Sequence, residues 1–189
     1  MFKLLGRAPA YQTGKPSKYL TMSEEIINRV AQSRLVTFDL EELYPKGKRV
    51  VFDIKDWLFE ELILREKQFR DDAQKHDWSQ YKDNYVALTC STDAIIPGWA
   101  FMLLAAHLQP YAKKVVIGDL ETLETAIYQD IIANLDTTAF VDKPVIIKGC
   151  ADLPVPENAY VLAMTKIQVV AKSVMYGEAC SSVPLFRRK

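Results

Sequence analysis

Three cysteines are the residues of this sequence whose type and surroundings suggest chemistry. Cys90, Cys150 and Cys180 each follow an apolar or extended run, and each has an acidic residue nearby and a proline a few positions later. In parallel α/β sheets, functional groups gather where the strands end. Three thiols that met at such an edge would suit zinc or an iron–sulfur cluster, because both take sulfur ligands.

Carboxylates beside the cysteines could complete a metal site. The predicted ligand set is Cys90, Cys150, Cys180, Asp93 and Asp152, with Glu178 and His107 as further candidates for the fourth position. Oxygen and imidazole ligands can accompany thiolates on zinc. The three cysteines are widely separated in the sequence and form no compact motif such as CxxC, so spacing alone does not identify the metal.

Two other interpretations of the cysteines stay open. Free cysteine is often a small buried hydrophobic residue, which would make the chain an interaction adaptor with structural thiols. A catalytic thiol would make it an enzyme instead. A neighbouring carboxylate raises the pKa of a thiol and suppresses the reactive thiolate, and neither histidine is near a cysteine in the sequence. The residues therefore favour a protein that is not an enzyme.

Composition predicts one globular domain without a strong electrostatic partner. The chain has 189 residues, of which 49% are hydrophobic and 25% charged, and its 24 basic residues balance its 24 acidic residues. A net charge of zero gives no reason to expect nucleic acid or an anionic membrane as partner. No apolar run approaches the length of a membrane helix. An odd number of cysteines cannot form a complete disulfide framework, which favours a reducing, cytoplasmic location. The oligomeric state is left open.

The segment 1–21 differs from the rest of the chain. It contains four basic residues and no acidic residue, and Pro9, Gly14 and Pro16 interrupt it. We therefore expect residues 1–21 to be a flexible basic extension and residues 22–189 to be a single α/β domain. The sequence Thr21-Met-Ser-Glu24 has the form of a capping box, which predicts a helix over residues 23–32.

The remaining pattern predicts strands that alternate with helices. Residues 35–40 and 49–54 are predicted as two strands of a hairpin around the turn Tyr44-Pro-Lys-Gly47. Further strands are expected over 85–89, 114–117, 144–147, 172–176 and 183–186, and helices over 66–75, 98–108, about 119–135 and 157–170. Such alternation indicates an α/β fold with a mostly parallel sheet flanked by helices, here with an N-terminal β-hairpin and helix.

A weak internal similarity accompanies this pattern. A strand, a cysteine, an aspartate, a proline and a helix follow one another over residues 85–108, and again over 144–170. The similarity is too loose to establish a duplication, since two strand-to-helix corners can use the same residue types.

Several segments resemble the domain of unknown function 2480 family of bacterial proteins. They are Ile26-Ile-Asn-Arg-Val, Leu35-Val-Thr-Phe-Asp-Leu, Phe52-Asp-Ile-Lys-Asp-Trp57, His76-Asp-Trp-Ser-Gln-Tyr81, Gln109-Pro-Tyr-Ala-Lys113, Ser173-Val-Met-Tyr-Gly-Glu178 and the three cysteine segments. The resemblance extends over residues 23–189 and implies no activity, cofactor or catalytic residue. Its members are often encoded beside sulfur-mobilisation components, so the resemblance suggests iron–sulfur assembly proteins as partners.

Together these observations predict a cytoplasmic, non-enzymatic α/β protein that binds zinc or an iron–sulfur cluster through the three cysteines and is accessory to iron–sulfur metabolism. The adaptor with buried cysteines and the thiol-dependent enzyme are the alternatives.

Overall fold

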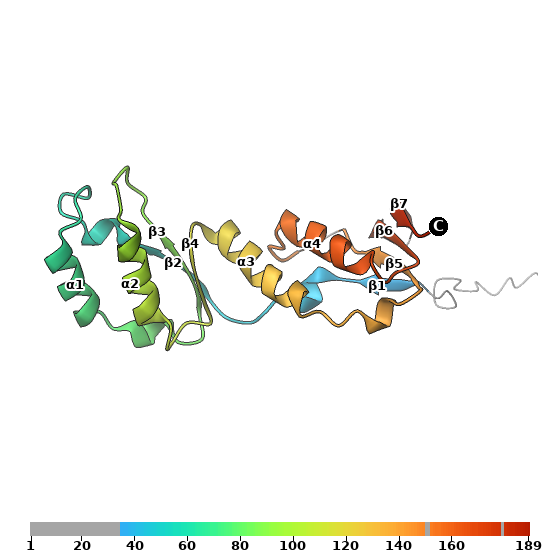
Figure 1. Cartoon of the computed structure of the whole chain (residues 1–189), viewed down its shortest axis with the longest axis horizontal. Coiled ribbons are helices and arrows are strands. Elements are labelled where there is room, and N and C mark those ends of the chain that lie inside the picture. Colours follow the sequence, from blue (N-terminus) through green and yellow to red (C-terminus); the bar gives the residue numbers. More distant parts are fainter. Residues whose placement is uncertain (1–34, 150–151, 179) are drawn as a thin grey trace, which may run out of the picture. The chain divides into compact units, whose positions relative to one another are not determined.

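The computed structural model describes residues 35–149, 152–178 and 180–189 (Figure 1). The expected basic extension over residues 1–21 and the expected helix over residues 23–32 lie outside the described residues. The described chain forms two β-sheets with four α-helices packed on them. Among the described helices, none combines the length and the apolar character needed to cross a membrane.

Sheet A contains four strands in the order β1-β5-β6-β7. The strands are β1 (Val36–Phe38), β5 (Pro144–Ile147), β6 (Ser173–Glu178) and β7 (Ser181–Arg187). The first three are parallel, and β7 returns antiparallel to β6. Helices α3 (Leu120–Ala133) and α4 (Glu157–Ile167) supply side chains to its hydrophobic core, which includes Phe38, Tyr128, Val145, Ala163 and Val174.

Sheet B contains three parallel strands in the order β2-β3-β4. The strands are β2 (Arg49–Asp53), β3 (Tyr85–Thr89) and β4 (Lys114–Ile117). Helices α1 (Glu66–Lys75) and α2 (Gly98–Leu108) share a core with one set of strand residues, including Phe52, Phe69, Val86 and Leu104. Helix α3 packs on the residues that alternate with them, through Leu123 and Ile127 against Tyr85 and Ala87. Because α3 also packs against α4, it contributes to the cores of both sheets.

The predicted α/β class with a mostly parallel sheet flanked by helices is confirmed, although the strands divide between two sheets. The predicted N-terminal hairpin is wrong. Strand β1 pairs with β5, and β2 pairs with β3, so the two strands never meet. The Asp39 carboxylate accepts a hydrogen bond from the backbone N–H of Glu41 and caps a 3₁₀ helix, Leu40–Leu43. This helix directs the chain away from β1 before a hairpin turn can form.

The weak internal similarity in the sequence corresponds to a structural repeat with a constant offset. In sheet B, Val86 pairs with Val115. In sheet A, Val145 and Val174 pair in the same way, and each follows its counterpart by the same number of positions. The same offset relates other local features. Asp77 and Asp136 each accept a hydrogen bond from the backbone N–H two residues later, near the start of a short 3₁₀ helix. Asp83 and Asp142 both have positive φ, and Phe69 and Tyr128 are both fully buried.

The two copies of the repeat are not consecutive, because one copy is inserted between the first strand of the other copy and the rest of it. Val36 of β1 pairs with Val145 just as Val50 of β2 pairs with Val86. Strand β1 therefore takes in sheet A the place that β2 takes in sheet B, although the whole of sheet B lies between β1 and β5 in the sequence. The copy from β2 to β4 is called repeat B. The copy that consists of β1 and the chain from α3 to β6 is called repeat A.

Candidate binding site

The two described cysteines follow strands of different sheets. Cys90 comes directly after β3 of sheet B, is half-buried, and packs against the core beneath α1 and α2. Its Sγ lies 3.3 Å from the hydroxyl of Thr92. Cys180 is exposed and lies between β6 and β7 of sheet A. Cys150 lies outside the described residues.

The predicted metal site requires the strand ends that precede Cys90 and Cys150 to lie at the same edge of one sheet. Strand β3 lies between β2 and β4, whereas β5 lies between β1 and β6, so they are not neighbours. The side chains of Asp93 and Asp152 are exposed. Within residues 35–149, 152–178 and 180–189, no group of three or more His, Cys, Asp or Glu is placed to hold a metal ion. The zinc or iron–sulfur ligand set, which includes a residue outside these ranges, stays a prediction.

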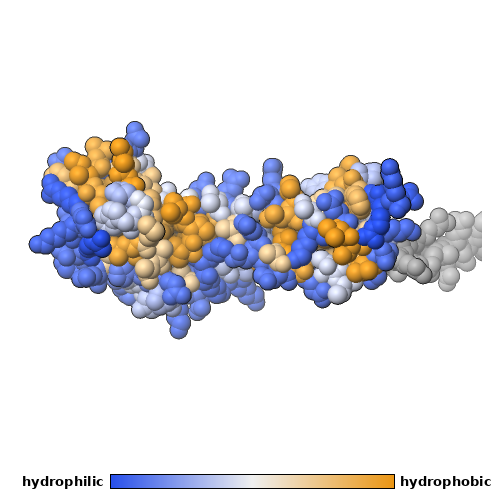
Figure 2. Space-filling model, viewed as in Figure 1, coloured by the Kyte–Doolittle hydropathy of each residue, from blue (hydrophilic) through white to orange (hydrophobic). Residues whose placement is uncertain are grey.

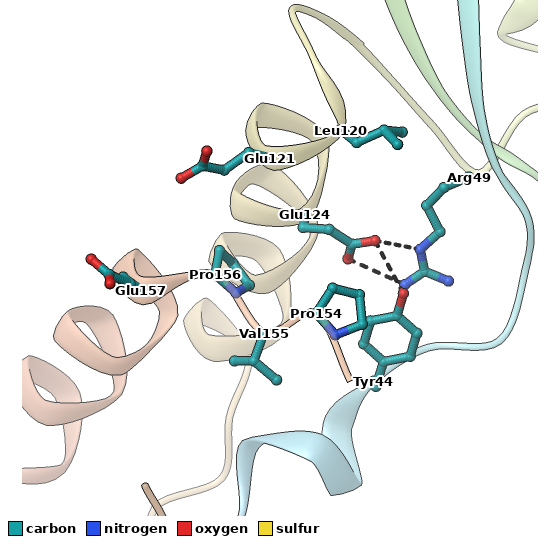
Figure 3. Close-up of a pocket in the computed structure, with 9 residues that line it drawn as sticks. All are labelled: Tyr44, Arg49, Leu120, Glu121, Glu124, Pro154, Val155, Pro156 and Glu157. Atoms are coloured by element: carbon teal, nitrogen blue, oxygen red, sulfur yellow. Dashed lines mark hydrogen bonds and ion pairs between the residues drawn. The ribbon is translucent and has the colours of Figure 1, made fainter. Parts of the chain in front are cut away.

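A pocket of about 510 Å³ lies elsewhere, where repeat A meets the start of sheet B (Figure 3). Four segments line it: the end of the 3₁₀ helix after β1, the first residue of β2, the first turns of α3 and the loop before α4. The lining residues are Tyr44, Arg49, Leu120, Glu121, Glu124, Pro154, Val155, Pro156 and Glu157. This volume falls within the range of small-ligand sites in proteins.

An ion pair between Arg49 and Glu124 forms one wall of the pocket. Arg49 Nε donates to Glu124 Oε1 at 2.6 Å, and a terminal guanidinium nitrogen donates to Oε2 at 3.2 Å. The hydroxyl of Tyr44 also donates to Oε1, at 3.2 Å. The two charged side chains are only 12% and 7% exposed. A buried pair of this kind tolerates desolvation because each charge has a partner and further hydrogen bonds.

The backbone between β1 and β2 holds the Arg49 guanidinium in place. Its second terminal nitrogen donates to the carbonyl oxygens of Pro45 and Gly47, at 2.7 and 2.8 Å. The guanidinium carbon lies 4.1 Å from the ring centre of Tyr44 and 4.8 Å from that of Tyr85, within cation–π range. Gly47 has φ +143°, and a Cβ there would lie 2.8 Å from the Tyr85 ring. Glycine is thus required for this turn to reach the arginine.

The electrostatics of this wall favour its charged form. Burial alone would lower the pKa of Arg49, but the hydrogen bond and the charge of Glu124 raise it above the usual value. Burial and the charge of Glu124 raise the pKa of Tyr44. Arg49 therefore stays cationic and Tyr44 stays a neutral hydroxyl near neutral pH. The ion pair adds no net charge to the pocket. The guanidinium of Arg49 and the carboxylate of Glu124 already bind each other.

The rest of the pocket combines apolar walls with an acidic rim. Leu120, Pro154 and Val155 contribute aliphatic surface. Glu121 and Glu157 are exposed and belong to the first turns of α3 and α4. Figure 3 shows both carboxylates directed away from Arg49, on the side of the pocket opposite the ion pair. The site is thus apolar inside and negatively charged at its edge.

The sequence did not point to Tyr44, Arg49 or Glu124, which are the residues that shape this site. Arg49 and Glu124 are 75 positions apart, and no local motif joins them. One signal was present. Glu124 is four residues after Leu120 and four before the buried Tyr128, so it lies on the inward face of an apolar helix. An acidic residue in that place needs a buried partner.

The comparisons with known proteins agree with the resemblance seen in the sequence. No curated protein and no solved structure matches the chain. One family model, described as a protein of unknown function, DUF2480, matches residues 24–188. The match covers nearly the whole chain, including every strand and helix that shapes the pocket. The chain therefore belongs to the DUF2480 family.

Proposed function

We propose that this protein is a binding module, not an enzyme, and that its pocket receives an apolar group that carries a positive charge. The observation that supports this most directly is the pocket itself, in which apolar walls, a neutralised ion pair and an acidic rim occur together. The proposal keeps only the binding role of the adaptor alternative, because that alternative required buried cysteines and Cys180 is exposed.

The interior of the pocket favours an apolar group. Leu120, Pro154 and Val155 present aliphatic surface, and the Tyr44 ring adds an aromatic edge. Burying apolar ligand surface against them gains about 25 cal/mol per Å².

The ion pair supports binding rather than acid–base catalysis. Both oxygens of Glu124 accept bonds from Arg49, and Oε1 also accepts from Tyr44. These bonds direct both carboxylate oxygens toward Arg49 and Tyr44 rather than toward a ligand. The described lining residues include no cysteine, histidine, serine or lysine that could act as a nucleophile or proton acceptor. We therefore assign the pair the role of a rigid wall.

The rim supports a positively charged ligand. Glu121 and Glu157 have no ion-pair partner among the described residues. Arg49 is paired with Glu124, so these two carboxylates are the charges of the described lining that are left without an ion-pair partner. Exposed charges interact weakly with one another in water. We therefore expect the two carboxylates to select the sign of the ligand's charge more than to set the affinity.

Methyl nuclear magnetic resonance can test this proposal with two probes of similar shape and opposite charge. We expect 2-phenylethylammonium to shift the methyl signals of Leu120 and Val155, and 3-phenylpropionate to bind roughly two- to tenfold more weakly. The double variant Glu121→Gln, Glu157→Gln should remove this preference, whereas Asp71→Asn, on the exposed side of α1, should not. If neither probe shifts these methyl signals at millimolar concentration, the pocket is not a binding site.

The predicted metal site stands as a second, separate proposal. One observation favours part of it: β5 and β6 are adjacent parallel strands, and the segments that contain Cys150 and Cys180 follow them in the sequence. Cys90 follows a strand of the other sheet and would have to reach them from there. Metal analysis and a visible spectrum of protein purified without oxygen would test the proposal. Substoichiometric zinc and iron, unchanged in Cys→Ala variants, would refute it.

A further inference from the structure

Repeat B carries, at the place that corresponds to the pocket, a surface that the proposed function does not use. The constant offset between the repeats relates Ile95 to Pro154 and Leu62 to Glu121. Pro154 and Glu121 line the pocket of repeat A. Their counterparts in repeat B lie in the two loops that follow the carboxyl ends of β2 and β3. Sites in parallel sheets are typically found at this edge.

These two loops present large aliphatic side chains to solvent. Leu62 is 56% exposed, Ile63 54% and Ile95 94%. We call these three residues the loop patch. Figure 2 shows apolar surface above α1 and α2, where these loops lie, at the upper left. Scattered exposed apolar residues are ordinary, but a group of them at one edge of a sheet indicates a binding surface.

The loop patch is held together by bonds within and between its two loops. The hydroxyl of Thr92, in the loop after β3, donates to the carbonyl oxygen of Glu61 at 2.8 Å. Within the other loop, the N–H groups of Phe59 and Ile63 donate to one another's carbonyl oxygens, at 2.8 and 3.0 Å. Glu60 and Glu61 adopt positive φ, 52° and 57°, so the backbone keeps an unfavourable conformation. The exposure of the aliphatic side chains therefore belongs to a defined loop structure.

The charges around the loop patch resemble those around the pocket. Glu60, Glu61 and Asp93 are exposed acidic residues of the same two loops. The nearby base, Arg65, has its guanidinium carbon 3.3 Å from the ring centre of Phe59. Acidic residues thus outnumber basic ones at both corresponding sites. Each site combines an apolar centre with a negatively charged rim, although their individual residues differ.

We infer that the loop patch is a second docking site, and that its occupant is a segment of a partner protein in which aliphatic residues alternate with lysine or arginine. The aliphatic side chains would cover Leu62, Ile63 and Ile95, and the basic side chains would face Glu60, Glu61 and Asp93. This inference rests on the proposed function only for the class of ligand. The surface itself is separate from the pocket, and each can bind without the other.

The test uses the full chain and a synthetic probe, the peptide amide acetyl-Lys-Leu-Lys-Ile-Lys, with acetyl-Glu-Leu-Glu-Ile-Glu as its acidic counterpart. Methyl signals of Ile63 and Ile95 report on the loop patch, and those of Leu120 and Val155 report on the pocket. We expect the basic peptide to shift the loop-patch signals and the acidic peptide to leave them nearly unchanged. The response should weaken with added salt, since screening shortens the range of the rim charges to about 8 Å at physiological ionic strength.

Substitutions of exposed residues show whether the shifts come from binding at the loop patch. Leu62→Ser with Ile95→Ser should abolish the shift at Ile63. Met102→Ser should not, although Met102 is an apolar residue of α2 whose exposure, 67%, lies between those of Leu62 and Ile95. Pocket signals that respond while Ile63 and Ile95 remain still would overturn the second site and leave the proposed function intact. Equal shifts with both peptides would overturn the basic partner. Silence at both places would overturn the second site, whereas the pocket is judged by its response to 2-phenylethylammonium.

Discussion

The buried ion pair of Arg49 and Glu124 gives a prediction whose size follows from its surroundings. Replacing Glu124 by Leu leaves Arg49 cationic, 12% exposed and still bonded to the carbonyl oxygens of Pro45 and Gly47. The charge cannot easily reach water. Removing one partner of a buried pair typically costs about 3–5 kcal/mol, so we expect Glu124→Leu to lower the free energy of unfolding by about that amount.

The double variant separates the charge from the packing. Arg49→Met together with Glu124→Leu removes both charges and keeps apolar bulk between Tyr44 and the first turns of α3. Replacing a whole buried pair by apolar residues is often neutral or even stabilising. We therefore expect the double variant to be more stable than Glu124→Leu alone, with a coupling energy of about 2–3 kcal/mol between the two positions. Urea unfolding followed by circular dichroism measures all the variants.

An exposed ion pair of the same chain provides the control. Glu66 and Arg70 pair along α1 at 2.9 Å, with side chains 64% and 49% exposed. Glu66→Ala should cost no more than about 0.3–0.5 kcal/mol. The single variant Arg49→Met completes the comparison. If Glu124→Leu costs as little as Glu66→Ala, or if the double variant loses as much stability as Glu124→Leu and Arg49→Met added together, the pair is not the buried, coupled wall described above.

Further predictions concern single residues. Gly177→Ala should destabilise the fold by about 1–3 kcal/mol, because φ is +119° and the new Cβ would lie 2.6 Å from the Ser181 carbonyl oxygen; thermal unfolding measures this. Phe69→Ala should cost about 3–5 kcal/mol by leaving a cavity in a fully buried site, as measured by urea unfolding. Burial lowers the pKa of His76, which Asp77 offsets only in part. The unfolded chain therefore takes up this proton first, so stability should fall as pH drops below about 6.5, and less in His76→Gln. In native protein, exposed Cys180 should be alkylated faster than half-buried Cys90, as mass spectrometry of timed samples will show.

Local signals in the sequence predicted most of the elements. Proline before a helix is one example: Pro97 precedes α2, which begins at Gly98, and Pro156 precedes α4, which begins at Glu157. Asp119 or Thr122 was expected to cap α3, and it is the Asp119 carboxylate that accepts from the backbone N–H of Thr122. In each case the information lies within one turn of the chain, so it is present in the sequence itself.

The same local signals could not predict which strands pair with one another. The apolar runs that became β1 and β2 looked like a hairpin because they flank a turn with Pro45 and Gly47, yet each pairs with a distant strand. The pocket depends on that pairing, since it places Arg49 beside Glu124. The cysteines illustrate the same limit, because three strand ends look equivalent in a sequence even when they belong to two sheets.

The insertion of repeat B within repeat A has a consequence for the way the chain emerges from the ribosome. Every strand of sheet B is made before β5 exists, so that sheet can assemble as soon as β4 is free. Strand β1 must wait, because Val145, the partner of Val36, is made only after the whole of sheet B and α3. At ordinary rates of translation this interval lasts roughly 5–20 s. Throughout it, β1 lacks its partner strand, and after Ile117 has been made the nascent chain contains every strand of the other sheet while β1 is still unpaired.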